Sequence, residues 1–312
     1  MPVPIDRTKL REVSHLELFA RHEVEGFIVG LHKSPFHGFS VEFAEHRQYN
    51  PGESTRHIDW KLYGRTDKMY TKKYEEETNL RCQIVIDTST SMYYPEEFDL
   101  KGAEFNKIKF SVYAAAALTE LLRRQRDAIG LSLFSDKLTA HSKPKTSLSH
   151  IRYLYDTLED LIDENKEREP KETNSLDALH EVAESTHRRS IIIIFSDMMD
   201  SNAKNLEEQF NALQHMRHNK HEVILFHVHD KKTEKDFEFE NRPYTFKDIE
   251  SGKEIKVQPS EVKESYVKAS HEFYNNLKMK CAQYAIDFIE ADIRAGIAPI
   301  LTSYLIKRKK MY

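Results

Sequence analysis

The stretch Leu80-Arg81-Cys82-Gln83-Ile84-Val85-Ile86, followed at once by Asp87-Thr88-Ser89-Thr90-Ser91, decides the fold class of this chain. Its apolar part predicts a strand, and its polar part predicts a loop at the end of that strand. Comparable strand patterns recur downstream at 129–134, 190–195, 222–228 and 286–289. Helical patterns separate them at 105–126, 147–163, 175–187, 203–218, 263–284 and 297–308. Strands that alternate with helices predict an α/β fold with a doubly wound, Rossmann-like parallel sheet.

Residues 190–195, Ser-Ile-Ile-Ile-Ile-Phe, form a continuous apolar run rather than an alternating one. A strand that is buried on both faces has this pattern, because helices cover both sides of a parallel sheet. We therefore expect residues 190–195 to form an interior strand.

The regions outside this alternation have a different composition. Residues 8–32 carry apolar residues at helical spacing, and residues 35–80 are rich in aromatic residues and interrupted by Pro and Gly, which indicates a small irregular β region. Residues 231–262 predict a β-hairpin insertion that turns near Gly252. We expect two domains, 1–79 and 80–312, with the insertion at about 231–262 in the second.

Composition narrows the class of partner and compartment. The chain has 312 residues with 47 basic and 51 acidic side chains, a net charge of −4, so there is no electrostatic case for nucleic acid or an anionic membrane as a general partner. Two cysteines suit a reducing compartment. The first residues lack the apolar core of a signal peptide, and the aliphatic runs are far shorter than the ~20 residues that cross a bilayer. We expect a cytoplasmic protein without membrane insertion.

Oxygen-bearing side chains follow two of the predicted strands. Asp87, Ser89 and Ser91 occupy alternate positions after the first strand, and Asp197 follows the run 190–195. Ligands of an open parallel sheet bind outside the carboxyl ends of its strands. Carboxylates and hydroxyls are hard ligands that suit Mg²⁺, Ca²⁺ or Mn²⁺. Thr173, just before a predicted helix, is either a helix cap or a further hydroxyl ligand.

The D-x-S-x-S loop, the threonine before a helix and the aspartate after an aliphatic strand resemble the metal-ion-dependent adhesion site of von Willebrand factor A domains. The resemblance implies a domain of that type, with Mg²⁺ as the favoured metal and a carboxylate from a bound protein at one coordination position. The implied ligands are Asp87, Ser89, Ser91, Thr173 and Asp197. Because two carboxylates only neutralise a divalent ion, a third carboxylate from a partner is not repelled.

Two positions depart from the pattern of that family. Lys171-Glu172 stand before Thr173, where the family usually has glycine, so that Ser175 is an alternative ligand. Met198-Met199 follow Asp197, again in place of the usual glycine, and this loop is therefore expected to take its own conformation.

The N-terminal half resembles a bacterial family of domains of unknown function, number fifty-eight. The resemblance rests on Gly38–Glu53, Arg56–Lys61, Gly64-Arg65-Thr66 and an F-x-D-x-E-x-G motif at 246–252, and it covers about residues 15–308. It implies action beside a MoxR-type AAA+ ATPase, in chaperone-like maturation or assembly. Arg56, Asp59 and Trp60 form a structural corner in the favoured interpretation and a partner-docking patch in the alternative.

The favoured function is a metal-dependent protein-binding adaptor, not an enzyme. The chain has no G-x-x-x-x-G-K-[ST] loop, so it is not itself expected to be a nucleotide-driven motor. A metal-dependent hydrolase at the same site is the main alternative, and a vestigial site in a scaffold protein is another. Zinc binding by the histidines at 215, 218, 221, 227 and 229 is disfavoured, because the first three lie at a predicted helix end.

Overall fold

The computed structural model of this chain describes residues 14–33, 46–48, 60–67, 69–72, 80–95, 105–162, 175–199, 203–247 and 254–311. The chain divides into two compact units. Residues 26–79 form the smaller unit, and residues 1–25 with 80–312 form the larger one.

Beyond the end of helix α1 (His15–Lys33), the described residues of the smaller unit form a short antiparallel strand pair and a short helix. Strand β1 (His46–Gln48) pairs with β2 (Tyr70–Lys72), and helix α2 (Trp60–Thr66) lies between them in the sequence. The β region expected at 35–80 is therefore only partly right, because residues 60–66 are helical. Aromatic residues fit a half-buried pleated surface, but their preference for strands is weak enough for context to override it.

The larger unit is built on a six-stranded sheet with the strand order β10-β7-β6-β3-β4-β5. Every neighbouring pair is parallel except β4 and β5, which are antiparallel. The strands are β3 (Arg81–Asp87), β4 (Ala128–Phe134), β5 (Leu138–His141), β6 (Ile191–Ser196), β7 (Glu222–His229) and β10 (Asp287–Asp292). The predicted α/β class with a mostly parallel, Rossmann-like sheet is confirmed. The antiparallel edge strand β5 was not predicted.

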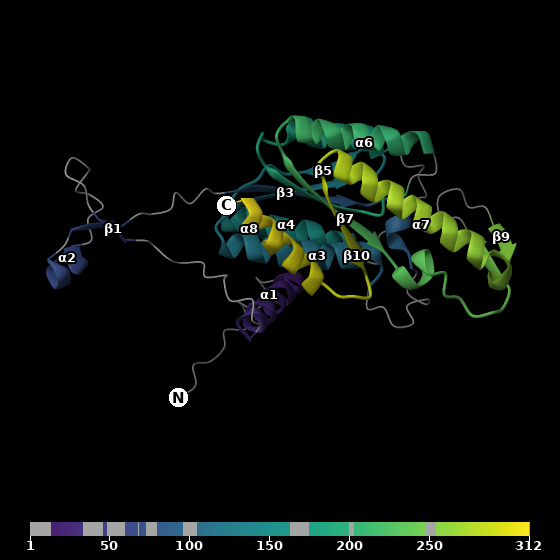
Figure 1. The fold of residues 1–312 in the computed structure, drawn as a ribbon, viewed down its shortest axis with the longest axis horizontal. Coiled ribbons are helices and arrows are strands. Elements are labelled where there is room, and N and C mark those ends of the chain that lie inside the picture. Colours follow the sequence, from purple (N-terminus) through teal and green to yellow (C-terminus); the bar gives the residue numbers. More distant parts are fainter. Residues whose placement is uncertain are drawn as a thin grey trace. The chain divides into compact units, whose positions relative to one another are not determined.

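Helices cover both faces of this sheet (Figure 1). One face carries α3 (Lys107–Arg124), α4 (Leu148–Ile162) and α8 (Ala298–Met311). The other carries α5 (Ser175–Ser185), α6 (Ala203–His218) and α7 (Pro259–Gln283). Helix α1 (His15–Lys33) buries Leu16, Ala20 and Val24, which are spaced four residues apart, and the backbone N–H of Leu16 donates to Glu159 of α4.

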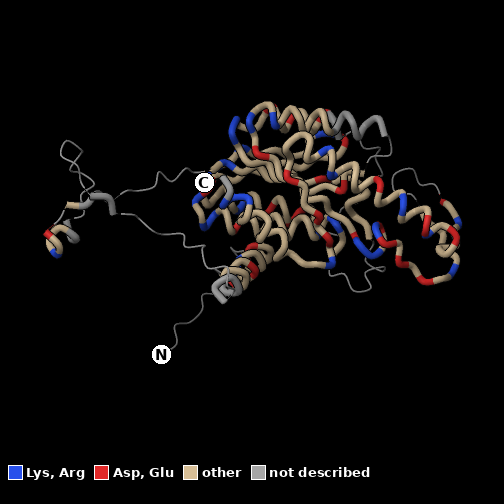
Figure 2. Tube along the Cα trace, viewed as in Figure 1, with Lys and Arg blue, Asp and Glu red and all other residues tan. Residues whose placement is uncertain are grey.

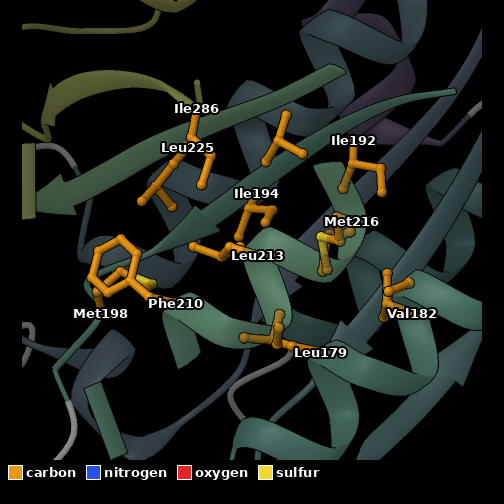
Figure 3. Close-up of a cluster of buried hydrophobic side chains, with 14 of the residues drawn as sticks. Leu179, Val182, Ile192, Ile194, Met198, Phe210, Leu213, Met216, Leu225 and Ile286 are labelled. Atoms are coloured by element: carbon orange, nitrogen blue, oxygen red, sulfur yellow. The ribbon is translucent and has the colours of Figure 1, made fainter. Parts of the chain in front are cut away.

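The core on the α5–α6 side of the sheet is drawn in Figure 3. Ile192 and Ile194 of β6 point from the sheet toward Leu213 and Met216 of α6 and Leu179 of α5. Every residue of β6 is buried, as the continuous apolar run predicts. Burial of apolar side chains stabilises the folded state by about 25 cal/mol per Å² of apolar surface removed from water. Because β6 is anchored in this way, the position of the loop that follows it is fixed.

One polar contact is built into the sheet. Gln83 of β3 donates from Nε2 to Ser132 Oγ at 2.8 Å and to the carbonyl of Ser142 at 3.2 Å. Gly130 makes room for it, because a Cβ at that position would lie 2.2 Å from Gln83 Oε1 and 2.5 Å from the Ser142 carbonyl oxygen. The close approach of Gln83 and the Ser142 carbonyl over β4 therefore depends on glycine at 130.

Four short elements complete the described structure. A 3₁₀ turn, η3 (Thr90–Tyr93), follows β3, and a π-helical turn, η5 (Lys231–Lys235), follows β7. Strands β8 (Tyr244–Lys247) and β9 (Glu254–Val257) pair antiparallel. The turn expected near Gly252 lies outside the described residues.

Charged residues of both signs are mixed along the helices of the larger unit (Figure 2). Across the described ranges, no helix is long and apolar enough to cross a membrane.

Candidate metal centre

The site lies where the strand order reverses. From β3 the chain crosses to β4 on one side, whereas β6 lies on the other side of β3 and continues to β7. Loops at such a reversal diverge at the carboxyl ends of the strands and leave room for a ligand. Asp87 ends β3, and Ser196 and Asp197 stand at the end of β6.

Asp87 is held by hydrogen bonds from both of these loops. Its Oδ1 accepts from the backbone N–H of Ser89 at 2.9 Å, and its Oδ2 accepts from Ser196 Oγ at 2.6 Å. The hydroxyls of Ser89 and Ser91 lie 3.1 Å apart. Asp87 and Ser89 are buried, while Ser91 is half-buried, so the group opens toward solvent at Ser91.

The second aspartate of the site, Asp197, is bound by a buried lysine. Its Oδ2 accepts from Lys107 Nζ at 2.7 Å, and its Oδ1 accepts from the backbone N–H of Met199 at 3.1 Å. The same ammonium donates to Glu234 Oε1 at 2.7 Å. The Lys107 and Asp197 side chains are only 1% and 2% exposed, so the ion pair is almost free of solvent screening.

Glu234 extends this network to the far edge of the sheet. Its second carboxylate oxygen accepts from the backbone N–H of Asp230 at 2.7 Å. Asp230, fully buried at the end of β7, accepts from Arg294 Nε at 2.6 Å and from Arg294 Nη2 at 2.8 Å. Charged contacts therefore run from the loop after β6 to the loop after β10.

His227 of β7 supports the backbone of the site. Its Nε2 lies 2.8 Å from the carbonyl oxygen of Asp197, which can only accept, so Nε2 carries the proton. Burial, reinforced by the neighbouring His229, lowers the pKa of His227 to about 3. His227 is thus a neutral donor that positions the Asp197 backbone.

The two aspartates respond differently to their surroundings. Burial and the nearby negative charge of Asp197 raise the pKa of Asp87 to about 6, against the hydrogen bonds from Ser196 and Ser89. Burial alone would raise the pKa of Asp197, but the Lys107 ammonium outweighs it and lowers the pKa. Two carboxylates that share a buried site without a cation between them are electrostatically unfavourable.

The donor chemistry suits a hard divalent cation. Asp87, Ser89, Ser91 and Asp197 offer carboxylate and hydroxyl oxygens, and each carboxylate oxygen retains a lone pair beyond its existing hydrogen bond. Among the residues that the structure describes, no three His, Cys, Asp or Glu side chains gather as metal ligands. A cation here would therefore depend on the serine hydroxyls as well as on the carboxylates.

Of the five metal ligands expected from the sequence, the structure brings four together, and Thr173 lies outside the described residues. Ser175, its alternative, begins α5, but its side chain is not described. Arg56 and Asp59 also lie outside the described residues, and Trp60 is described only as the first residue of α2. The expected docking patch therefore stays a prediction.

Three residues of the site were not foreseen from the sequence: Lys107, Glu234 and Ser196. Lys107 carried a signal, because it is the first residue of α3, where the positive end of the helix dipole disfavours a cation. A lysine at such a position needs an anionic partner from elsewhere in the fold. Nothing around Glu234 in the sequence marks it as that partner.

The histidines considered for zinc lie on α6, on β7 or between them, and their contacts include one another, His180 and the backbone. His215 of α6 lies 3.4 Å from His180 of α5, measured between their Nδ1 atoms. His221 accepts from the backbone N–H of Ser190, and His229 lies 3.1 Å from the carbonyl oxygen of His227. Their contacts are those of packing and backbone support.

The fold and site thus define a Rossmann-like α/β protein with a cluster of oxygen-bearing side chains at the reversal of its strand order. The chain belongs to the family described as "Protein of unknown function DUF58", whose family model matches residues 45–274.

The named relatives carry no assigned function. Uncharacterized protein Rv1480 of Mycobacterium tuberculosis (strain ATCC 25618 / H37Rv) is 24% identical over 184 residues, which cover 59% of this chain and 55% of that protein. Uncharacterized protein Mb1516 of Mycobacterium bovis (strain ATCC BAA-935 / AF2122/97) matches at the same 24% identity over 184 residues. The chain therefore spans about half the length of the curated relatives that it matches.

Similar solved structures include the conserved hypothetical protein BatB from Bacteroides thetaiotaomicron, at 12% identity and a TM-score of 0.44 over 74% of this chain and 99% of that one. An aerotolerance-related membrane protein from Bacteroides fragilis NCTC 9343 aligns at 12% identity and a TM-score of 0.43 over 73% of this chain and 99% of that one.

Proposed function

We propose that this protein is a metal-dependent protein-binding adaptor of the von Willebrand factor A type and that it is not an enzyme. One observation carries the proposal: Asp87, Ser89, Ser91 and Asp197 converge at the carboxyl ends of two adjacent strands where the strand order reverses. These are the positions at which the resemblance expects the ligands of a Mg²⁺ ion, with Ca²⁺ or Mn²⁺ as alternatives.

Charge balance supports a carboxylate of a partner as the group that is recognised. A divalent cation between Asp87 and Asp197 leaves that pair neutral, and the adjacent Lys107 and Glu234 form a balanced ion pair of their own. A bound Mg²⁺ would supply an electrophilic contact for an incoming oxygen. The half-buried Ser91 and the exposed Met199 mark the side from which a partner would approach.

The family resemblance makes a MoxR-type AAA+ ATPase the first partner to test, in a chaperone-like maturation or assembly role. A protein contact through one metal-bound carboxylate is small, so we expect it to be supported by surface around the site. The cytoplasm is the compartment in which we expect this to occur.

A binding experiment tests the metal and the partner separately. Mg²⁺ and Mn²⁺ are titrated calorimetrically into the wild-type chain, into Asp87→Ala and into Asp156→Ala, whose carboxylate is exposed on α4. Binding by the wild type and Asp156→Ala, with none by Asp87→Ala, is expected. Folding of each variant is checked by circular dichroism.

The second arm uses a purified MoxR-type ATPase from the same organism. Capture by the wild type in Mg²⁺, lost in EDTA and in Asp87→Ala, is the expected result. Capture that is indifferent to both EDTA and Asp87→Ala would show that this site is not the contact, and the segment around Trp60 would become the next surface to test.

A further inference from the structure

Lys107 places a permanent positive charge inside the candidate metal centre. Its ammonium lies 2.7 Å from Asp197 Oδ2 and 2.7 Å from Glu234 Oε1, and the lysine side chain is 1% exposed. Asn106 holds its backbone at the start of α3 by accepting from the N–H of Lys109 at 2.9 Å. The position of the ammonium is therefore fixed by a helix, a strand end and the π-helical turn.

The charges of this cluster do not cancel. Asp87, Asp197 and Glu234 bring three negative charges, and Lys107 brings one positive charge, which leaves two negative charges unbalanced. A second cation–anion pair, Arg294 with Asp230, is balanced within itself and does not alter the difference. The residual charge equals that of one divalent ion.

We propose that Lys107 is a tethered cation whose charge opposes a divalent ion and that, together with Glu234, it sets how tightly the centre binds that ion. This inference rests on the proposed metal centre and adds to it the residues that tune it. Lys107 acts through Asp197, because its ammonium binds Oδ2 of that carboxylate, while Oδ1 accepts from the backbone N–H of Met199.

The physical reason is the low screening of buried charges. A unit charge within a few ångströms of a divalent ion changes the binding affinity by an order of magnitude or more, even at the effective dielectric constant of about 20 that suits protein sites. Removing Lys107 adds one net negative charge to the centre, and neutralising Glu234 removes one. Changing both together restores the original net charge.

The test compares the wild type with Lys107→Met, Glu234→Gln and the double variant, at about pH 7.5, well above ordinary carboxyl pKa values. Mn²⁺ and Mg²⁺ binding is measured by calorimetry. Lys107→Met should bind at least ~10-fold more tightly and Glu234→Gln at least ~10-fold more weakly, with the double variant within ~3-fold of the wild type.

Thermal unfolding supplies a readout that does not depend on a partner. In EDTA, Lys107→Met should unfold at a lower temperature than the wild type, because Asp197, Asp87 and Glu234 repel one another without a cation. Saturating Mn²⁺ should raise its midpoint more than it raises that of the wild type. If Lys107→Met does not fold, Glu234→Gln, which keeps the Lys107–Asp197 contact, tests the electrostatic basis of the inference, and binding no weaker than that of the wild type overturns it.

The outcomes separate this inference from the proposed function. Equal affinity in all four proteins overturns the role of Lys107 and leaves the metal centre standing. Binding by Lys107→Met alone supports the role of Lys107 and defeats a metal-dependent function for the natural chain. Absence of binding in every variant overturns both.

Discussion

Met198 holds a backbone conformation that a side chain normally avoids. Its φ is +49°, in the left-handed region, and its side chain is buried in the cluster of Figure 3. This is the position at which the von Willebrand factor A resemblance expects glycine. The chain therefore keeps an unfavourable φ at the end of β6, where a buried thioether offsets the cost.

Two substitutions separate the backbone cost from the packing. Met198→Ala should destabilise the protein by ~2–4 kcal/mol, because it leaves a cavity in the core. Met198→Gly should be less harmful by ~1 kcal/mol, since glycine alone adopts a positive φ without steric cost. Chemical denaturation of the three proteins measures both effects. A glycine variant that is less stable than the alanine variant would refute the argument from the backbone.

At the scale of residues, the sequence predicts side chains that follow strands but not those that reach the site from elsewhere. Asp87, Ser89, Ser91 and Asp197 could be identified because each follows an apolar run that predicts a strand end. Lys107 and Glu234 lie 127 positions apart, and only the folded chain brings them into contact. Long-range pairs of this kind have no local sequence pattern.

Helix α3 carries the lysine of the site, and a capping contact determines where it begins. Asn106 Oδ1 accepts from the backbone N–H of Lys109 at 2.9 Å, which satisfies one of the unpaired donors of the first turn. The next residue, Lys107, is a cation at the positive end of the helix dipole, which disfavours the start of the helix. The stabilisation by the cap offsets this unfavourable interaction.

Asn106→Ala should therefore lower the free energy of unfolding by ~1 kcal/mol. Asn106→Asp should keep or increase stability, because an anion at a helix N-terminus is favourable. Urea denaturation measures both variants against the wild type. If aspartate is as harmful as alanine, the contact at Asn106 is not acting as a cap.

Long elements were predictable and short ones were not. The strands β3, β4, β6 and β7 and the helices α3 to α7 fall within a few residues of the expected ranges, because each has a sustained apolar pattern. Strand β5, helix α2 and the π-helical turn η5 have four, seven and five residues, too few for a period to show. Strand β5 also runs along an edge where its residues are half-exposed, so its apolar content is low.

At the scale of the whole molecule, buried ion pairs tie the strand ends of the larger unit to one another. Asp230 follows β7 and binds Arg294, which follows β10. Burial alone would raise the pKa of Asp230, but hydrogen bonds and charge from Arg294, with further bonds from Thr233 and Lys232, lower it below its ordinary value.

A carboxyl group whose pKa is lower in the folded state stabilises the protein above the unfolded pKa of about 3.9 and loses that contribution as pH falls through the folded pKa. Asp230→Asn should cost ~2–4 kcal/mol near neutral pH, because Arg294 loses its partner. The difference between the two proteins should shrink below about pH 4. Free energies of unfolding of the wild type and of Asp230→Asn, measured from neutral pH to below about pH 4, check this prediction. A difference that stays constant with pH would show that Asp230 does not act through its charge.

The contact between Gln83, Gly130 and the carbonyl of Ser142 has an evolutionary consequence. A larger residue at 130 would collide with Gln83 Oε1 and with the Ser142 backbone, so it could be accepted only after the side chain at 83 had shortened and the edge strand had moved. Lineages that descend from this sequence are thus constrained to change these positions in a particular order. Gln83 and Gly130, which lie 47 positions apart in the chain, are therefore expected to change together rather than independently.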